Sequence, residues 1–149
     1  SGLGASADFF LGWRFNVPAG GMRVRRLGAG VSANSVQVTM FVAIVALTGP
    51  TDLPDVTNLS GTDLRSTSLI PIPANFSGEV SVAVDLLLAP GWYGEFFGTG
   101  SYGASAGFVN LPTVQNMVCA SGQAPVSIRQ SDGNVFTATT APHMFVDHD

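Results

Sequence analysis

Apolar side chains occupy every second position from Glu79 to Leu88, and mostly small or polar side chains stand between them. A period of two places the apolar side chains on one face of a β-strand, whereas a helix would scatter them around its axis. The stretch is therefore expected to form a half-buried strand of an antiparallel sheet. Its apolar face calls for a second layer to cover it, which favours a two-sheet core.

Other β signals recur along the chain and are separated by turns rich in Gly and Pro. The apolar run Val36–Leu47 alternates at first and becomes apolar on both faces from Met40, which indicates a strand covered on both sides. Pro90-Gly91 and Asp132-Gly133 predict two tight β-hairpins, the first spanning Glu79 to Phe97. The expected strands are Phe9–Val17, Met22–Ala29, Val36–Leu47, Thr67–Ile72, Glu79–Leu88, Trp92–Gly98, a short one about Val118-Cys119, Pro125–Gln130, Val135–Thr139 and His143–Asp147.

No stretch has a helical period, so the fold class is expected to be all-β, an antiparallel β-sandwich or jelly roll of about nine or ten strands. A length of 149 residues suits one domain spanning residues 1–149, in which residues 1–8 are expected to be a flexible N-terminal segment. The single cysteine, Cys119, excludes an intrachain disulfide and is interpreted as a small buried apolar residue.

The charge content limits the classes of partner. Charged residues make up 11% of the chain and hydrophobic residues 46%, with a net charge of −4 and no lysine. An acidic chain without clustered cations does not suit nucleic acid, and no apolar run is long enough to insert into a membrane. The low charge leaves apolar surface that either fills a two-sheet core or faces a partner, such as another copy of the chain.

Two glycine motifs overlap between Gly98 and Gly107. Residues 98–103 match the dinucleotide fingerprint G-x-G-x-x-G, and residues 103–107 match the nucleophile elbow G-x-S-x-G. Both motifs must open a helix, which the closely spaced glycines disfavour. We therefore interpret these glycines as bends between strands.

Two sets of residues suggest catalysis but have simpler explanations. Ser105, Asp132 and His143 follow the order of a serine hydrolase triad, although the turn already explains Asp132. Asp85 and Glu95 would face each other across the expected hairpin, as the two carboxylates of a glycosidase do, although solvent positions explain both. No catalytic residue is assigned, and the chain is expected not to be an enzyme.

Metal and cofactor sites are likewise not expected. The loop 48–66 contains Asp52, Asp55 and Asp63, which are candidates for a Ca²⁺ site, but their spacing lacks the D-x-D-x-D-G pattern. Aspartates in such loops usually form Asx-turns. A site near the C-terminus would use His143, Asp147, His148 and Asp149, although surface residues of these types are ordinary.

Aromatic residues gather on two expected strands and one loop. Core packing accounts for most of them. Trp92 and Tyr102 are the candidate ligand-binding residues, because an exposed aromatic ring on a sandwich surface makes a stacking platform for a sugar.

The chain resembles a family of exported proteins. The motifs that carry the resemblance are Leu11 to Val17, IVALTGPTDLP from Ile44 and LAPGWYGEFFGTGSYGAS from Leu88. Over roughly residues 9–107 their order is similar to that in secreted bacterial β-sandwich domains of PEP-CTERM-type exported proteins. The resemblance implies export, a cell-surface or matrix location, and no assigned catalytic residues.

These observations together predict a secreted, non-enzymatic β-sandwich that acts as a structural or adhesive module at the cell surface or in the extracellular matrix. Self-association into a homo-oligomer or filament is a further expectation. The alternative is a carbohydrate-binding module that uses exposed aromatic side chains, with extracellular polysaccharide as its partner. A small serine hydrolase is a remote alternative.

Overall fold

The computed structural model describes residues 2–54, 59, 63–113, 125–132, 134–137 and 141–149. Within these residues the chain forms eleven β-strands and no helix. The strands are β1 (Gly2–Ser6), β2 (Phe9–Val17), β3 (Met22–Ala33), β4 (Val38–Leu47), β5 (Leu64–Ile72), β6 (Ser77–Leu88), β7 (Gly91–Gly98), β8 (Phe108–Pro112), β9 (Val126–Arg129), β10 (Val135–Thr137) and β11 (Met144–His148). The expected all-β class is confirmed.

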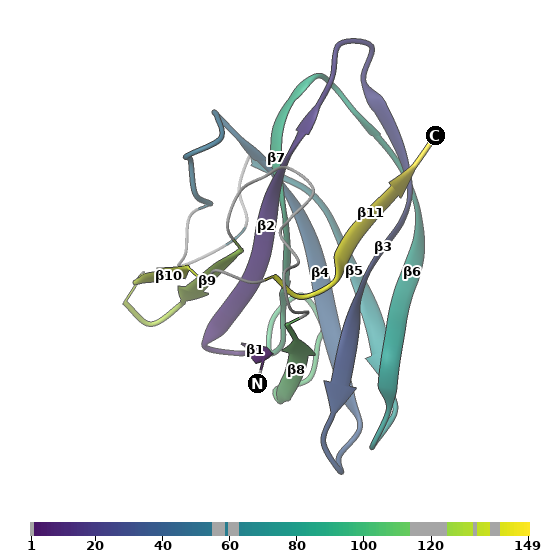
Figure 1. The fold of residues 1–149 in the computed structure, drawn as a ribbon, viewed down its shortest axis with the longest axis vertical. Coiled ribbons are helices and arrows are strands. Elements are labelled where there is room, and N and C mark those ends of the chain that lie inside the picture. The colour runs from purple at the N-terminus through teal and green to yellow at the C-terminus, as the bar shows by residue number, and fades with distance from the viewer. Residues whose placement is uncertain (1, 55–58, 60–62, 114–124, 133, 138–140) are drawn as a thin grey trace.

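The strands form two antiparallel sheets that pack face to face as a β-sandwich (Figure 1). The six-stranded sheet has the order β10-β9-β2-β7-β4-β5. The five-stranded sheet is built around β3, which pairs with β6 along one edge and with β11 and β8 along the other. Strand β1 extends this sheet through β8.

The main core lies between the two sheets. Its buried side chains come from the inward rows of both sheets: Val24, Leu27, Ala29, Val31, Val109 and Leu111 on one side, and Leu11, Trp13, Phe15, Met40, Val42, Ile44, Ile70, Ile72, Tyr93 and Phe97 on the other. These rows follow the period of two that strands impose, so burial and strand geometry agree.

The outer face of the six-stranded sheet carries a second apolar cluster. Phe41, Ala43 and Val45 of β4 are fully buried there with Phe10 and Phe96. This confirms that β4 is covered on both sides, as its sequence predicts. Leu47 at the end of β4, Leu64 at the start of β5 and side chains from connecting segments complete the cover; the latter are Leu53, Leu59, Tyr102 and Ala104.

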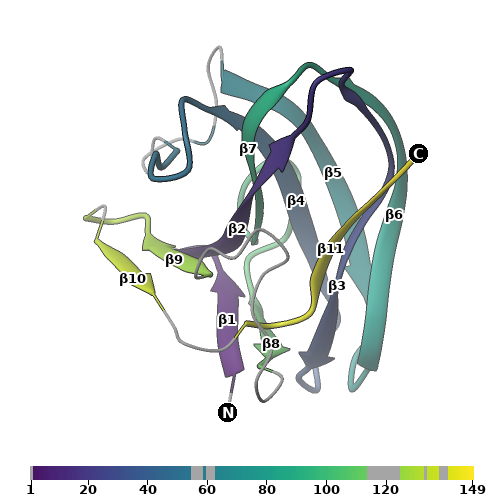
Figure 2. The ribbon, with the colours of Figure 1, turned by 45° about the horizontal axis from the view of Figure 1, so that its top comes forward.

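The hairpin expected between Glu79 and Phe97 is wrong. Strand β6 pairs with β3 in one sheet, whereas β7 pairs with β2 and β4 in the other, so Pro90-Gly91 leads from sheet to sheet (Figure 2). Pro and Gly favour a reversal of the chain but do not choose the neighbour of the next strand. The choice follows from burial, because β7 is buried on both faces and belongs in the middle of a sheet.

Two further differences concern strand limits and facing. Gly2–Ser6, expected to be flexible, forms β1, because small residues there let β8 lie close; Gly4 lies against the Phe108 ring, and Ala5 is fully buried. In β3 a register shift between Val24 and Arg26 moves the following residues to the opposite face from the one that strict alternation predicts.

The hairpin at Asp132 is confirmed as the β9–β10 pair. The strand expected about Val118-Cys119 lies outside the described residues.

Candidate ligand pocket

A pocket of about 380 Å³ lies at an open side of the sandwich, between strand β2 of one sheet and strand β11 of the other. On one edge of β2, strand β9 pairs with Phe9–Gly12 and no further. The rest of that edge, Trp13–Val17, has no partner strand among the described residues. On the five-stranded sheet, β11 is the nearest edge. The pocket is lined by Trp13, Phe15 and Asn16 of β2, Met22 of β3, Trp92 of β7, and Val146 and His148 of β11.

The wall of the pocket is aromatic and held in place by packing. The rings of Trp13 and Phe15 lie 5.3 Å apart, and Phe15 stacks on Tyr93 at 6.0 Å. The Tyr93 hydroxyl donates a 2.8 Å hydrogen bond to the carbonyl oxygen of Ala89. Because these residues pack in the core on their other sides, their rings are fixed before any ligand arrives.

Behind this wall stands a buried carboxyl group. Trp13 and Glu95 are directly opposite on β2 and β7, and the indole Nε1–H of Trp13 donates a 2.7 Å hydrogen bond to Oε1 of Glu95. Glu95 is fully buried, and its Oε2 has no hydrogen-bond partner among the described residues. A buried polar atom without a partner is uncommon in native proteins and marks this pair as a specialised feature.

Burial raises the pKa of the Glu95 carboxyl well above its ordinary value. The hydrogen bond from the Trp13 N–H acts in the opposite direction, as does the nearby backbone N–H of Gly28, which does not meet the geometry of a hydrogen bond to Oε2. The carboxylate of Asp147 raises the pKa further. Because Oε1 accepts the hydrogen bond from Trp13, a proton on the carboxyl group would sit on Oε2. The indole N–H of Trp13 is thus already engaged by Glu95, so Trp13 presents only its apolar ring to the pocket.

Two polar side chains lie among the lining residues. Asn16 donates a 3.4 Å hydrogen bond from Nδ2 to the carbonyl oxygen of Gly91, which leaves its Oδ1 as an acceptor. His148 places Nδ1 3.1 Å from the carbonyl oxygen of Asp149, which leaves Nε2 for another partner. No Asp, Glu, Lys or Arg lines the pocket within the described part of the chain.

The two predicted ligand-binding residues do not share a site. Trp92, half-buried, lines the pocket at the start of β7. Tyr102 follows the other end of β7 and packs edge-on against Phe41 at 5.1 Å, and partial burial raises its pKa. The strand separates them by ~20 Å at about 3.4 Å per residue. Tyr102 therefore serves to cover the outer face of the six-stranded sheet.

The residues of the suggested triad have separate partners. The Ser105 hydroxyl accepts a hydrogen bond from the Thr39 backbone N–H, and the Asp132 carboxylate accepts from Asn134 and Arg129. His143 lies 5.3 Å ring to ring from Phe145, beside β3. No hydrogen bond between described residues joins any of the three to another.

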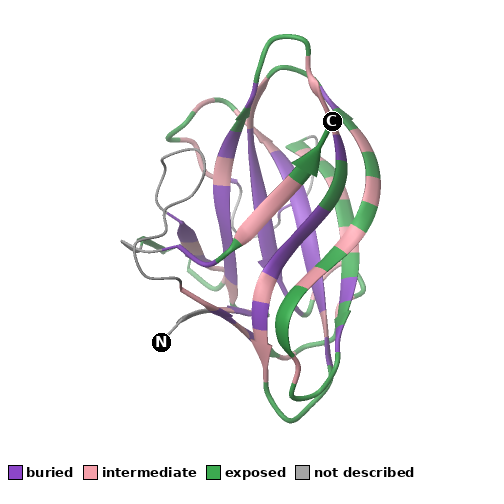
Figure 3. Cartoon of the chain, turned by 45° about the vertical axis from the view of Figure 1, so that its right-hand side comes forward, coloured by how far each residue is buried: buried purple, intermediate pink, exposed green. Residues whose placement is uncertain are grey.

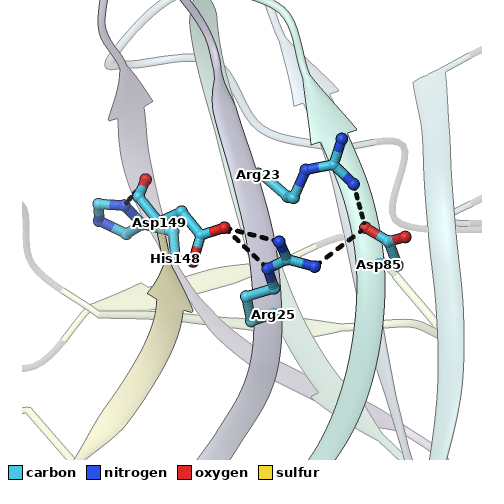
Figure 4. Close-up of polar contacts among 5 residues, drawn as sticks. All are labelled: Arg23, Arg25, Asp85, His148 and Asp149. Atoms are coloured by element: carbon cyan, nitrogen blue, oxygen red, sulfur yellow. Dashed lines mark hydrogen bonds and ion pairs between the residues drawn. The ribbon is translucent and has the colours of Figure 1, made fainter.

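The suggested carboxylate pair is wrong as a facing pair. Glu95 is buried between the sheets, whereas Asp85 lies on the exposed face of the five-stranded sheet. Asp85 belongs to an ion network that Figure 4 shows, in which Arg25 lies between Asp85 and Asp149. The distances are 2.7 Å from Arg23 to Asp85 and 2.7 Å from Arg25 to Asp149.

The metal candidates are likewise used locally. The Asp52 carboxylate accepts hydrogen bonds from the backbone N–H groups of Thr48 and Leu53, both at 2.9 Å, and these lower its pKa. Asp63 is exposed, and Asp55 lies outside the described residues. Near the C-terminus, Asp147 pairs with Arg26 at 2.9 Å. Among the residues that the structure describes, no group of three or more His, Cys, Asp or Glu is placed to hold a metal ion.

Sequence reasoning missed Trp13 and the role of Glu95. The available signal was a charged residue between aromatic and glycine neighbours in the apolar stretch Gly91–Gly98, where burial on both faces was foreseeable. The cross-strand partner of Glu95 was not foreseeable, because β2 and β7 are far apart in the sequence and nothing local fixes their register.

No protein-family model, curated protein or solved structure matches this chain. The described part of the chain contains no helix that could span a lipid bilayer.

Proposed function

We propose that this chain is a non-catalytic β-sandwich module that binds carbohydrate in the pocket between β2 and β11. The observation that carries the proposal is a cavity of about 380 Å³ with three aromatic side chains in its wall, Trp13, Phe15 and Trp92. This volume lies at the lower end of the range for small-molecule sites, which are concave, mostly apolar and equipped with a few polar groups.

The chemistry of the lining favours a neutral ligand with one apolar face. An aromatic ring carries negative charge on its face, which attracts the polarised C–H groups of a sugar ring. Asn16 Oδ1 and His148 Nε2 supply an acceptor and a hydrogen-bonding nitrogen for hydroxyl groups at the rim. The absence of Asp, Glu, Lys and Arg from the described lining gives an ionic ligand no counter-charge.

The preformed wall supports binding without a large entropic cost. Trp13 is 6% exposed and is held by Glu95 on one side and by Phe15 on another. A ligand that stacks in this pocket would not have to order these side chains. Trp92 is more exposed than Trp13, so it is the side chain whose removal should cost affinity with the least effect on the core.

A structural or adhesive role outside the cell is part of the same proposal. Its support is the resemblance to exported β-sandwich domains described above, and it implies that the ligand is a sugar of an extracellular polysaccharide. Binding of this kind would attach the module to a matrix or to a neighbouring cell.

The test is a glycan and polysaccharide array probed with the purified chain, followed by calorimetry on the best ligand. Trp92→Ala is expected to weaken binding at least tenfold, the effect of losing about 1.4 kcal/mol. Phe136→Ala is the matched control, because it removes an exposed aromatic ring on β10, which contributes nothing to the pocket lining. If the wild-type chain binds no sugar, or if Trp92→Ala binds as tightly as wild type, the proposal is wrong.

A further inference from the structure

Strand β6 presents a long unpaired edge. It pairs with β3 along one side, and no described strand pairs with its other side. Its twelve residues contain no proline and no lysine or arginine, and Glu79 and Asp85 are its only charged side chains. Natural proteins protect such edges with prolines, positive charges, bulges or short strands, because an open edge accepts another strand.

The neighbouring edge of the other sheet is protected. Strand β5, which also pairs on one side only, contains Pro71. Its pairing with β4 shifts register between Ile44 and Val45, which leaves an extra residue, Arg65, in β5. A proline and a bulge both discourage strand addition. Of these two edge strands, β5 is therefore protected against the addition of another strand and β6 is not.

Strand β6 is also less covered than a sandwich strand should be. Its inward-facing residues Val80, Val82, Val84 and Leu86 are only half-buried, although they pack against the core, and Figure 3 shows the alternation along the strand. On the outward row, Leu87 is 68% exposed. A further strand alongside β6 would remove apolar surface of both rows from contact with water, which is favourable.

We propose that the partner of this edge is the β6 strand of a second copy, paired antiparallel about a two-fold axis. In an antiparallel pair, residues directly opposite point to the same face, so each residue must meet one of its own parity. Only two registers then overlap nearly the whole strand. One centres the axis on Val82, and the other centres it on Ala83.

Charge separates these two registers. With the axis at Val82, Glu79 of each copy stands opposite Asp85 of the other, and like charges directly opposite are destabilising. With the axis at Ala83, Asp85 stands opposite Ser81, whose hydroxyl can donate to its carboxylate. Glu79 of one copy then stands opposite Leu87 of the other, and Leu87 is the residue of β6 that pairs with Arg23 on β3. The Ala83 register thus brings the second copy's acid towards an arginine.

The inward row is self-complementary in the same register. Val82 meets Val84, and Val80 meets Leu86, so every close inward pair is apolar. The two five-stranded sheets become one continuous sheet. The two-fold axis closes the contact as a dimer, because the contact occupies the unpaired edge of β6 in both copies. This inference is independent of the carbohydrate pocket, which lies at β2 and β11.

The first experiment measures mass by light scattering during gel filtration over a range of concentrations. The wild-type chain is expected to shift from one to two copies as concentration rises. Ala83→Glu places like charges opposite at the axis and should raise the dimer dissociation constant about fivefold or more. Thr67→Glu, an exposed change on the β5 edge, should leave it unchanged. Circular dichroism checks that both variants fold.

The second experiment tests the register by disulfide trapping in a Cys119→Ser background. Ala83→Cys is expected to form a covalent dimer under mild oxidation, because opposite Cβ atoms lie about 4.5–5.5 Å apart. Leu87→Cys should not, because its two copies would be eight residues apart, about 27 Å. A wild-type chain that is monomeric at every concentration, a large species unaffected by Ala83→Glu, or faster trapping at Leu87 than at Ala83 would overturn the proposal.

Discussion

The indole nitrogen of Trp13 lies 2.7 Å from Oε1 of Glu95, and the two residues face each other across β2 and β7 in the middle of the molecule. One end of this pair faces the pocket, and the other is a carboxyl oxygen in the core that has no hydrogen-bond partner in the described part of the chain. The pair links the stability of the sandwich to the shape of the candidate ligand site. A change of pH acts on this pair through the protonation of the Glu95 carboxyl group.

Replacing Glu95 by Gln should change how stability depends on pH. The pKa of Glu95 is higher in the folded chain than in the unfolded chain, so between the two values the folded chain holds a proton that the unfolded chain has lost. The contribution of Glu95 is therefore complete below its unfolded pKa of about 4.3. It falls by about 1.4 kcal/mol per pH unit until the pH passes the folded value.

Urea unfolding of wild type and Glu95→Gln at a series of pH values measures this effect. The difference in unfolding free energy between the two should drift in favour of the variant as the pH rises from about 4.3. Groups with lowered pKa, such as Asp52, cancel in that difference. A difference that is constant across the series would show that Glu95 has an ordinary pKa.

The hydrogen bond itself can be measured by a double-mutant cycle. Trp13→Phe leaves Oε1 of Glu95 without its donor and should cost about 1–3 kcal/mol in addition to the loss of packing. Glu95→Met removes the carboxyl group but leaves the Trp13 N–H unpaired. The double variant should be more stable than the sum of the single losses predicts, by about 1 kcal/mol or more. Additive losses would mean that the pair is not coupled.

Gly12 lies beside this pair and should not tolerate a side chain. A Cβ at this position would overlap the carbonyl oxygen of Glu95 and would lie 2.6 Å from the Phe96 ring. Gly12→Ala is expected to lower the unfolding free energy by about 1–3 kcal/mol. Gly49→Ala is the control, because nothing lies within 4 Å of a Cβ there, and its effect should stay within about 0.5 kcal/mol. Equal thermal midpoints for the two variants would contradict this prediction.

The exposed arginines should make only a salt-sensitive contribution. Arg25 donates a hydrogen bond to Asp149, which lowers the pKa of that carboxyl group. The stabilisation is thus present above the unfolded pKa and is lost as the pH falls through the lowered value. Arg25→Gln should lower stability slightly near neutral pH and not at all in acid or high salt. An unfolding series at two salt concentrations measures this, and a loss that persists in high salt would contradict it.

Local patterns predicted most of the strands but missed β1 and β8, and they did not predict which strands pair. The range Phe9–Val17 was predicted as it stands, and the double-sided burial of β4 followed from its apolar run. The hairpin between Glu79 and Phe97 failed because a turn sequence describes a reversal and not a partner strand. The facing of Arg26 and Leu27 changed because a bulge adds one residue to β3 and reverses the alternation beyond it.

The sequence by itself determined the all-β class, because a period of two and frequent turn residues allow no other use of these segments. It also determined that Trp92 was a candidate ligand contact, since its residue type is visible without a fold. Only the tertiary structure decided that Trp13 also lines the pocket, that Glu95 is buried behind Trp13, and that Tyr102 lies elsewhere. The physical reason is that each of these contacts joins segments that are distant in the chain, and their alignment is fixed only when the strands pair in register and the two sheets pack.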